Sequence, residues 1–201
     1  MKLLHSPASP FVRKVHMTLI ETGQLDDVEI VSTVAGPGRA QEHLLSANPL
    51  GKIPALIRAD APTLLDSRVI CRFLDDRADA GLYPATRLWE VLTLEATADG
   101  MMDAAVLVVY EGRFREAEQQ SESWKEAQWA RVTRSLDALE SQWMAHLAAP
   151  LDMGQIALAC ALGYLDFRHA DRNWRATRPA LADWFTEISA RPSMQQTLPQ
   201  G

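Results

Sequence analysis

Along the first 80 residues, short apolar runs alternate with segments whose apolar residues recur at helical spacing. Extended segments are predicted at four places, namely residues 2–5, 28–34, 53–58 and 63–65. Helices are predicted at three, namely residues 10–22, 40–46 and from 66 onward. The order strand, helix, strand, helix, strand, strand, helix indicates an α/β domain that is closed by a hairpin.

Beyond Leu82-Tyr83-Pro84 the pattern is helical throughout. Helices are predicted at residues 87–118, bent or split near Gly112, then at 123–148, at 156–169 and after Pro179. The run Ile156 to Leu162 has no polar face, which is typical of a helix in the middle of a bundle. We therefore predict residues 1–80 as one domain, 81–86 as a linker and 87–201 as an all-helical domain.

Composition narrows the function classes. The chain has 201 residues, 47% of them hydrophobic, and a formal net charge of −6. It has no dense run of Lys and Arg, so nucleic acid is not an expected partner. No apolar run reaches the roughly 18 residues of a membrane span, and the first residues turn polar at His5, unlike a signal peptide. These two observations lead us to expect a cytoplasmic protein. Cys71 and Cys160 have no Cys or His neighbour at metal-ligand spacing, so no bound metal is expected.

The tripeptide Ser9-Pro10-Phe11 follows the first predicted strand and opens the first helix. Serine at the N-cap and proline at the first helical position are a common way to begin a helix, so capping is the simpler role for Ser9. The same geometry also suits an anion, because a helix N-terminus presents free N–H groups and partial positive charge. A thiolate placed there could accept a further hydrogen bond from the Ser9 hydroxyl.

Two later segments are ambiguous in the same way. In Asn48-Pro49-Leu50-Gly51-Lys52-Ile53-Pro54, X–Pro frequencies alone predict a trans bond before Pro54. A cis bond would turn the backbone of Ile53 outward, free to pair with an extended peptide. Asp66-Ser67 caps the next predicted helix, or else holds the ammonium and carboxylate groups of an α-amino acid.

Together these motifs, in this order and spacing, resemble the N-terminal domain of cytosolic glutathione S-transferases, most closely the serine-type bacterial members. The resemblance continues into the segment from Gly154 to Arg168, which is similar to the core helix of a bacterial subgroup. There Asp152 and Gln155 occupy the places of the family's buried S/T-x-x-D capping box. The residue types differ, but an aspartate cap with glutamine three residues later can form the same kind of hydrogen bonds. The resemblance implies a thioredoxin-like N-terminal domain followed by a helical bundle.

The resemblance also implies an activity, in which glutathione is a co-substrate and no other cofactor is needed. Ser9 would activate the glutathione thiol, which then attacks a small electrophile, as in detoxification. Ile53, ahead of a Pro54 expected to be cis, would pair with the cysteinyl backbone. Phe11 is also expected to contact glutathione. Arg39 and Lys52 would lie near its glycyl end, and Asp66 and Ser67 at its γ-glutamyl end.

The electrophile is expected between Ser9 and the long helix of the second domain, where Met102, Val106 and Tyr110 fall on adjacent turns. The same spacing would also place these three residues on an apolar helix face that packs into the core. Family members usually dimerise, so the resemblance implies a homodimer. Two alternatives stay open: a non-catalytic dimeric binding or regulatory protein, and glutathione-dependent reduction of disulfides or peroxides. Reduction usually needs Cys where Ser9 stands.

Overall fold

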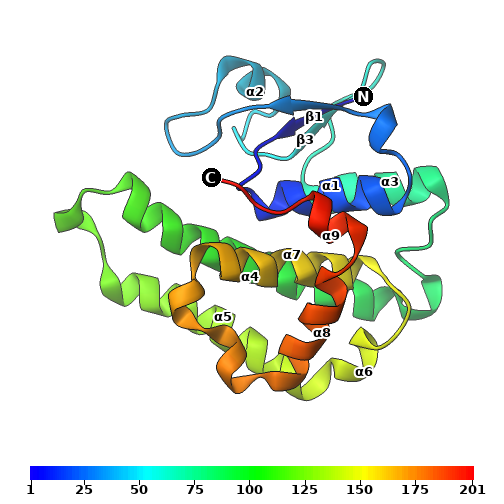
Figure 1. Ribbon diagram of the computed structural model, residues 1–201. Coiled ribbons are helices and arrows are strands. Elements are labelled where there is room, and N and C mark those ends of the chain that lie inside the picture. Colours follow the sequence, from blue (N-terminus) through cyan, green and yellow to red (C-terminus); the bar gives the residue numbers. More distant parts are fainter. The chain divides into compact units, whose positions relative to one another are not determined.

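The computed structural model describes residues 1–201, which form two units (Figure 1). The first unit comprises residues 1–86 together with 192–201, and the second comprises residues 87–191. The first part of the chain thus ends where the linker was predicted. The last ten residues differ from the prediction, because they belong to the first unit rather than to the helical one.

The first unit is built on a three-stranded sheet in the order β2-β1-β3. Its strands are β1 (Lys2–His5), β2 (Glu29–Ser32) and β3 (Ala55–Ile57). β1 pairs parallel with β2 and antiparallel with β3. The predicted hairpin is reduced, because its second strand survives only as a single bridge between Leu56 and Leu64.

Helices cover both faces of this sheet (Figure 1). They are α1 (Pro10–Glu21), α2 (Glu42–Ala47) and α3 (Ser67–Ala78). Leu4 and Ala55 pack with Leu44 of α2 in a buried cluster. Because side chains alternate along a strand, the buried Leu3 and Leu56 point to the opposite face, which α1 and α3 cover. The unit is therefore a helix–sheet–helix sandwich of the thioredoxin-like kind.

The C-terminal segment completes the first unit with a short helix, α9 (Pro192–Gln196), that packs on α1. The Arg13 guanidinium, 6% exposed, donates to the carbonyl of Met194 at 3.1 Å and to Thr197 Oγ1 at 3.3 Å. Farther on, the Gln200 amide donates to the Pro7 carbonyl at 3.3 Å. The sequence pattern gave no sign of these contacts, which join residues more than 180 positions apart.

The second unit is entirely helical. Its helices are α4 (Leu88–Phe114), α5 (Glu122–Gln142), α6 (Met144–Leu147), α7 (Met153–Arg168) and α8 (Pro179–Ser189). Short 3₁₀ turns occur along the chain at Leu25–Asp27, Ala85–Arg87, Ala117–Gln119, Ala170–Arg172 and Trp174–Thr177. No helix in the structure is both long and apolar enough to cross a bilayer.

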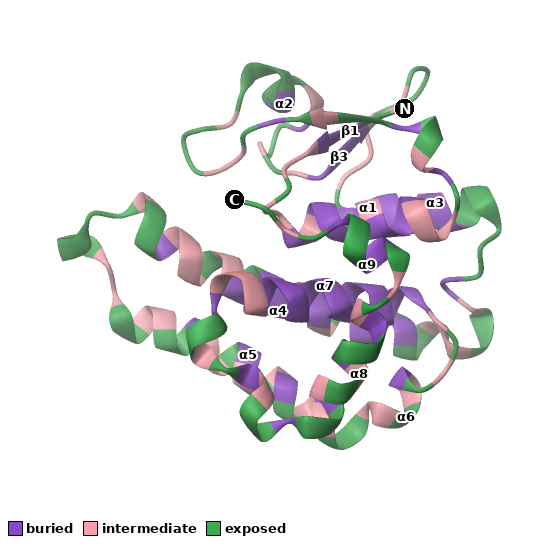
Figure 2. Cartoon of the chain, viewed as in Figure 1, coloured by how far each residue is buried: buried purple, intermediate pink, exposed green.

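Helix α7 is the core of this unit, as its apolar sequence predicted. Every residue from Met153 to Leu165 is buried, and Figure 2 shows the helix purple along most of its length. It packs chiefly against α4 and also against α8. Asp152 caps it, with Oδ1 accepting from the Gln155 amide at 3.1 Å. The Gln155 side chain does not return to Asp152 but donates to the carbonyls of His146 and Ala149, both at 3.1 Å, so the box is not reciprocal.

Two helix boundaries differ from the prediction. The helix predicted at 123–148 breaks at Trp143, which separates α5 from α6. Its start also lies earlier, because Ser121 and not Ser123 is the N-cap and accepts from the Trp124 amide at 3.2 Å. Helix α4, by contrast, runs through Gly112 to Phe114 without interruption.

Candidate functional site

The three motifs meet at one end of the sheet in the first unit. β1 ends at His5 and leads into the loop that carries Ser9. Because β3 is antiparallel and Ala55 lies opposite Leu4, the segment before β3 lies beside that same end. Leu64 lies opposite Leu56, so the chain that continues to Asp66 runs back along β3 toward Pro54. The topology alone thus brings residues 9, 53–54 and 66–67 together.

Ser9 is the N-cap of α1, as the sequence predicted. Its Oγ accepts a hydrogen bond from the Val12 amide at 3.3 Å, and Pro10 occupies the first helical position. The hydroxyl is partly exposed and donates to no group in the chain. A serine hydroxyl can accept and donate at once. Its proton is therefore available to a ligand at the helix N-terminus, while its lone pair holds the helix.

The loop before β3 presents the backbone of Ile53. The Ile53–Pro54 bond is cis, as the resemblance implied and contrary to the expectation from X–Pro frequencies. The amide and carbonyl of Ile53 make no hydrogen bond within the chain. Lys52 is exposed and forms no ion pair. This segment thus offers one donor, one acceptor and a cation to a ligand.

Asp66 and Ser67 begin α3. Asp66 is the N-cap, and its Oδ1 accepts from the Arg68 amide at 3.0 Å, so the capping role is confirmed. Asp66 is exposed, whereas Ser67 is 2% exposed. The Leu65–Asp66 bond is also cis. Because α1 and α3 both begin at this end of the sheet, two helix N-termini give it positive potential.

Two further residues named from the sequence flank this end. Phe11 lies in the first turn of α1 and is partly buried. Arg39 is exposed on the loop between β2 and α2. Gln41 fixes that loop, because its Oε1 accepts from both Thr33 Oγ1 and the Val34 amide at 3.0 Å.

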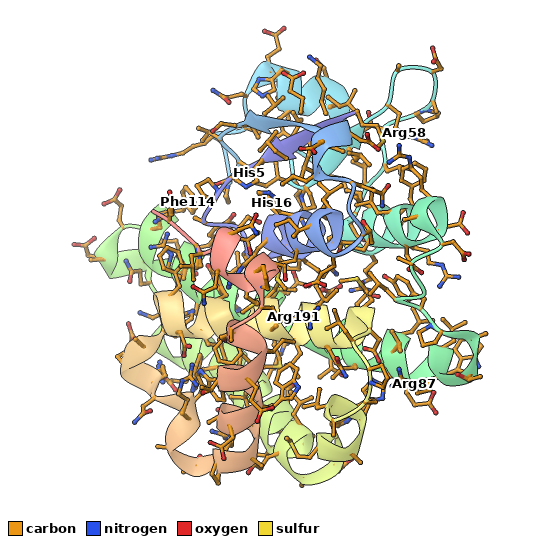
Figure 3. The ribbon with its side chains drawn as sticks, turned by 45° about the vertical axis from the view of Figure 1, so that its right-hand side comes forward. His5, His16, Arg58, Arg87, Phe114 and Arg191 are labelled. Atoms are coloured by element: carbon orange, nitrogen blue, oxygen red, sulfur yellow. The ribbon has the colours of Figure 1, made fainter.

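His5 and His16 form a pair next to Ser9 in sequence. Their rings meet edge to face with centroids 5.6 Å apart (Figure 3). Burial, followed by the charge of His16, lowers the pKa of His5 to about 4, and burial also lowers the pKa of His16. Both rings are therefore neutral at pH 7. Neither ring makes a hydrogen bond to Ser9, so no histidine–serine relay is formed.

The loop before β3 is held by a buried asparagine that was not predicted from the sequence. Asn48 is 2% exposed, donates from Nδ2 to the Lys52 carbonyl at 2.7 Å and accepts at Oδ1 from the Leu50 amide at 2.9 Å. Gly51 has φ +62°, and a Cβ there would lie 3.2 Å from Leu45 Cδ2. Asparagine followed by glycine three residues later was the available signal, because such residues form side-chain-closed turns.

In the second unit, Met102, Val106 and Tyr110 lie on one stripe of α4, as their spacing predicted. Met102 is 1% exposed, whereas Val106 and Tyr110 are partly exposed. Met102 is thus a core residue, and the partly exposed surface of the stripe begins at Val106. No group of three or more His, Cys, Asp or Glu side chains is arranged to hold a metal ion.

Comparison with family models identifies both units. Residues 8–77 match the glutathione S-transferase N-terminal domain, and residues 122–187 match the glutathione S-transferase C-terminal domain. A curated relative, the uncharacterized GST-like protein YibF of Escherichia coli K12, is 35% identical over 204 residues. The match covers 99% of this chain and 98% of the relative.

Solved structures give the same result. A glutathione transferase family member from Pseudomonas fluorescens Pf-5 with bound glutathione is 47% identical, with a TM-score of 0.97 over 100% of this chain and 99% of that one. A structure from the same source with bound S-(propanoic acid)-glutathione is 46% identical, with a TM-score of 0.92 and full coverage of both chains. A glutathione S-transferase from Methylobacillus flagellatus KT with glutathione bound is 37% identical, with a TM-score of 0.88 over 99% of each chain.

Proposed function

Because the chain belongs to the glutathione S-transferase family, we propose that it binds glutathione in its first unit and transfers it to a small electrophile. We further propose that it is a serine-type member, in which Ser9 stabilises the glutathione thiolate. The supporting observation is the Ser9 hydroxyl, which caps α1 through its lone pair and keeps its proton free at the helix N-terminus.

The Ser9 hydrogen bond and the N-terminus of α1 can together supply the free energy that is needed to lower the pKa of the glutathione thiol. A free thiol has a pKa of about 8.5, so only a few per cent of it is thiolate at pH 7. Lowering the pKa by about two units requires roughly 2.7 kcal/mol of preferential thiolate stabilisation. A hydrogen bond to a charged group contributes about 1.5–3 kcal/mol, and a helix N-terminus adds about 0.3–1 kcal/mol.

The rest of the site supports binding of the tripeptide along its length. The unpaired backbone groups of Ile53 suit an extended cysteinyl backbone, by strand addition. Lys52 and Arg39 supply positive charge for the glycyl carboxylate. Ser67 and the first turn of α3 suit the γ-glutamyl carboxylate, and Asp66 suits its ammonium group.

The relatives support both binding and conjugation. Two of them hold glutathione, and one holds S-(propanoic acid)-glutathione, in which a carbon chain is attached to the sulfur. In the proposed reaction the thiolate forms a carbon–sulfur bond, and the displaced group leaves with the electron pair of the bond that breaks. Both cysteines of the chain are buried, so neither presents a thiol for the alternative disulfide chemistry.

We also propose a cytoplasmic homodimer with a role in detoxification. Apolar exposure on α4 supports association with a second copy, because Trp89 and Leu92, three residues apart, are 76% and 37% exposed. Sedimentation of the wild-type chain and of Trp89→Lys tests this. A dimer that Trp89→Lys weakens is expected, and a monomeric wild type would contradict it.

Ser9→Ala and Ser9→Gly test the thiolate proposal. We expect both variants to retain glutathione but to raise the pKa of the bound thiol by about one to two units, through loss of one charge-assisted hydrogen bond. The readout is the ultraviolet absorbance of the thiolate against pH. Glycine is the matched control for capping, because it costs the helix only a few tenths of a kcal/mol where alanine costs about 1 kcal/mol.

Three outcomes would each overturn a part of the proposal. An unaltered titration curve in both variants would show that another group activates the sulfur. Absence of thermal stabilisation by millimolar glutathione would remove the binding site itself, since at about 100 times the Kd the gain should be about 2.7 kcal/mol. Binding without turnover of any electrophile would instead favour the regulatory alternative.

A further inference from the structure

The turn between α2 and β3 is built around Asn48. The Asn48 amide ends α2 by donating to the Leu44 carbonyl at 2.7 Å, and the Asn48 carbonyl accepts from the Gly51 amide at 2.8 Å. The side chain closes the turn from inside, because Oδ1 accepts from the Leu50 amide at 2.9 Å and Nδ2 donates to the Lys52 carbonyl at 2.7 Å. Asn48 is 2% exposed, so its side-chain bonds are shielded from water.

The two partners of the Asn48 side chain fix its orientation. The backbone N–H of Leu50 needs an acceptor, and the backbone carbonyl of Lys52 needs a donor. Turning the amide over would set donor against donor and acceptor against acceptor. An ionised carboxylate, which only accepts, could replace the bond to Leu50 but not the bond to Lys52.

The bond to Lys52 acts on the peptide group that also carries the Ile53 amide. The Lys52 carbonyl and the Ile53 N–H belong to one planar trans peptide group, so they point in opposite directions. Holding the carbonyl toward Asn48 therefore fixes the direction of the N–H, which makes no hydrogen bond within the chain. The hydrogen bond to the carbonyl also polarises that N–H. The Ile53 side chain packs against the buried cluster around Leu44, which holds the other side of the residue.

We propose that Asn48 is a positioning residue for the cysteinyl part of glutathione, because it orients the Ile53 N–H toward the cysteinyl carbonyl before the ligand arrives. A peptide group that is already held in place loses less conformational freedom on binding. This inference rests on the proposed function, since Asn48 acts through Ile53 at the same glutathione site. Because it does not act through Ser9, it should govern how tightly the tripeptide binds and not the pKa of its thiol.

Calorimetry with S-methylglutathione tests this role without the thiolate, since the sulfur of this probe cannot ionise. Asn48→Ala removes both side-chain bonds, whereas Asn48→Asp keeps the acceptor for Leu50 and removes the donor to Lys52. We expect both variants to bind the probe about tenfold or more weakly than the wild type. Wild-type affinity in Asn48→Asp would overturn the proposal.

Gln24→Ala is the matched control. Gln24 is also a buried amide side chain of the first unit, 5% exposed, and its Nε2 donates to the Leu74 carbonyl at 2.8 Å. It precedes β2, whose first residue Glu29 lies opposite Lys2 at the start of β1, so it belongs to the end of the sheet away from the glutathione site. Gln24→Ala should lower the unfolding midpoint but bind S-methylglutathione like the wild type.

A second probe separates orientation of the Ile53 N–H from general loosening of the loop. In γ-glutamyl-S-methylcysteinyl-glycolate an ester replaces the peptide bond after cysteine, so the cysteinyl carbonyl is a weaker acceptor. The wild type and Gln24→Ala should bind this ester about tenfold more weakly than S-methylglutathione, and the ratio should fall toward one in both Asn48 variants. A ratio that the variants leave unchanged would overturn the proposal. If neither variant folds, the wild type decides: the tenfold ratio supports the proposal, and equal affinities overturn it.

Kinetics with 1-chloro-2,4-dinitrobenzene distinguishes failure of this inference from failure of the proposed function. The thiolate forms the carbon–sulfur bond, chloride leaves with the electron pair of the carbon–chlorine bond, and the thiol proton passes to solvent. In Asn48→Asp the KM for glutathione should rise about tenfold, with little change in kcat or in the pKa of the bound thiol. A lower kcat with an unchanged KM overturns the positioning role and leaves the transferase intact. A wild type that neither binds nor turns over glutathione overturns the transferase, and if it binds without turnover, calorimetry still decides the role of Asn48.

Discussion

At the scale of single residues, the same chemistry serves folding and function at the helix starts. Ser9, Asp66, Ser121 and Asp152 all accept a backbone N–H at the beginning of a helix. The bond fixes the backbone and also places the side chain where the helix potential is most positive. A sequence can therefore predict the cap at Ser9 without deciding whether a ligand uses it. The topology of the strands decides which cap lies beside Ile53.

His5 makes the stability of the first unit depend on pH. Its pKa in the folded chain is about 4, below the ordinary 6.5, because it is half-buried beside His16. The unfolded chain therefore binds more protons between these values, so the free energy of unfolding decreases as the pH falls from about 6.5 toward 4. We predict that His5→Asn makes this decrease smaller, measured by urea unfolding at pH 7.5 and pH 5.

The control for His5 is His43→Asn, at an exposed position on α2. It should leave the dependence on pH close to that of the wild type. If His5→Asn and the wild type lose the same stability between the two pH values, the half-buried histidine pair is not the cause. His16 contributes in the same direction, so the dependence should be reduced by His5→Asn and not abolished.

At the scale of elements, Gly154 sets how closely α7 approaches α4. A Cβ at this position would lie 2.9 Å from Leu94 Cβ and 3.0 Å from the Val91 carbonyl. Backbone and Cβ atoms of a packed helix cannot move aside cheaply. We predict that Gly154→Ala lowers the free energy of unfolding by about 1–3 kcal/mol, measured by urea denaturation.

The same helix pair supplies controls with the opposite sign. A Cβ at Gly100 or Gly112 of α4 meets nothing within 4 Å. Alanine is a better helix former than glycine, so Gly100→Ala and Gly112→Ala should raise the free energy of unfolding by about 0.5–1 kcal/mol. Equal effects at all three positions would show that helix propensity, and not the close approach, governs Gly154.

Asp152 is the buried anchor at the start of α7. Its carboxylate is 0% exposed, caps Gln155 and lies 2.9 Å from His146 Nε2 and 3.4 Å from Arg87 Nη1. We predict that Asp152→Ala costs about 3 kcal/mol of unfolding free energy, because it removes the cap and the only anion beside two buried nitrogen atoms. Urea denaturation measures it. Ser121→Ala, at the partly exposed cap of α5, is the comparison and should cost about 1 kcal/mol, and equal losses would contradict the buried role.

Much of the element pattern could be predicted from the sequence, for physical reasons that also explain the failures. The apolar run of α7 leaves the helix without a polar face, so it must be buried on all sides, and its central place in the bundle was predictable. The reduction of the second hairpin strand to a single bridge was not predictable. Pairing over so few residues depends on their tertiary context and not on their sequence pattern. The break at Trp143 has no proline or glycine to signal it. The residue cluster around Ile53 comes from packing between segments that are distant in the sequence, which periodicity does not encode.

At the scale of the whole molecule, the chain leaves its first unit at Thr86 and returns to it at Pro192. The returning segment is held by specific contacts, since Ser193 Oγ donates to Glu21 Oε1 at 2.5 Å and the Met194 side chain is 2% exposed. The first unit is therefore discontinuous in sequence. Its α1, which begins at the proposed thiolate site, depends on residues from the opposite end of the chain.

A chain ending at Arg191 tests this dependence. Truncation removes the burial of Met194, worth about 1.5–3 kcal/mol, and the acceptors that Met194 and Thr197 offer to Arg13. We predict a loss of about 3 kcal/mol or more in the free energy of unfolding, with faster hydrogen exchange concentrated in the amides of α1. A chain ending at Pro199 is the control: it loses only the Gln200–Pro7 bond, worth about 1 kcal/mol. Exchange that increases equally in α1 and in the helices of the second unit would show that the segment does not act on the first unit in particular.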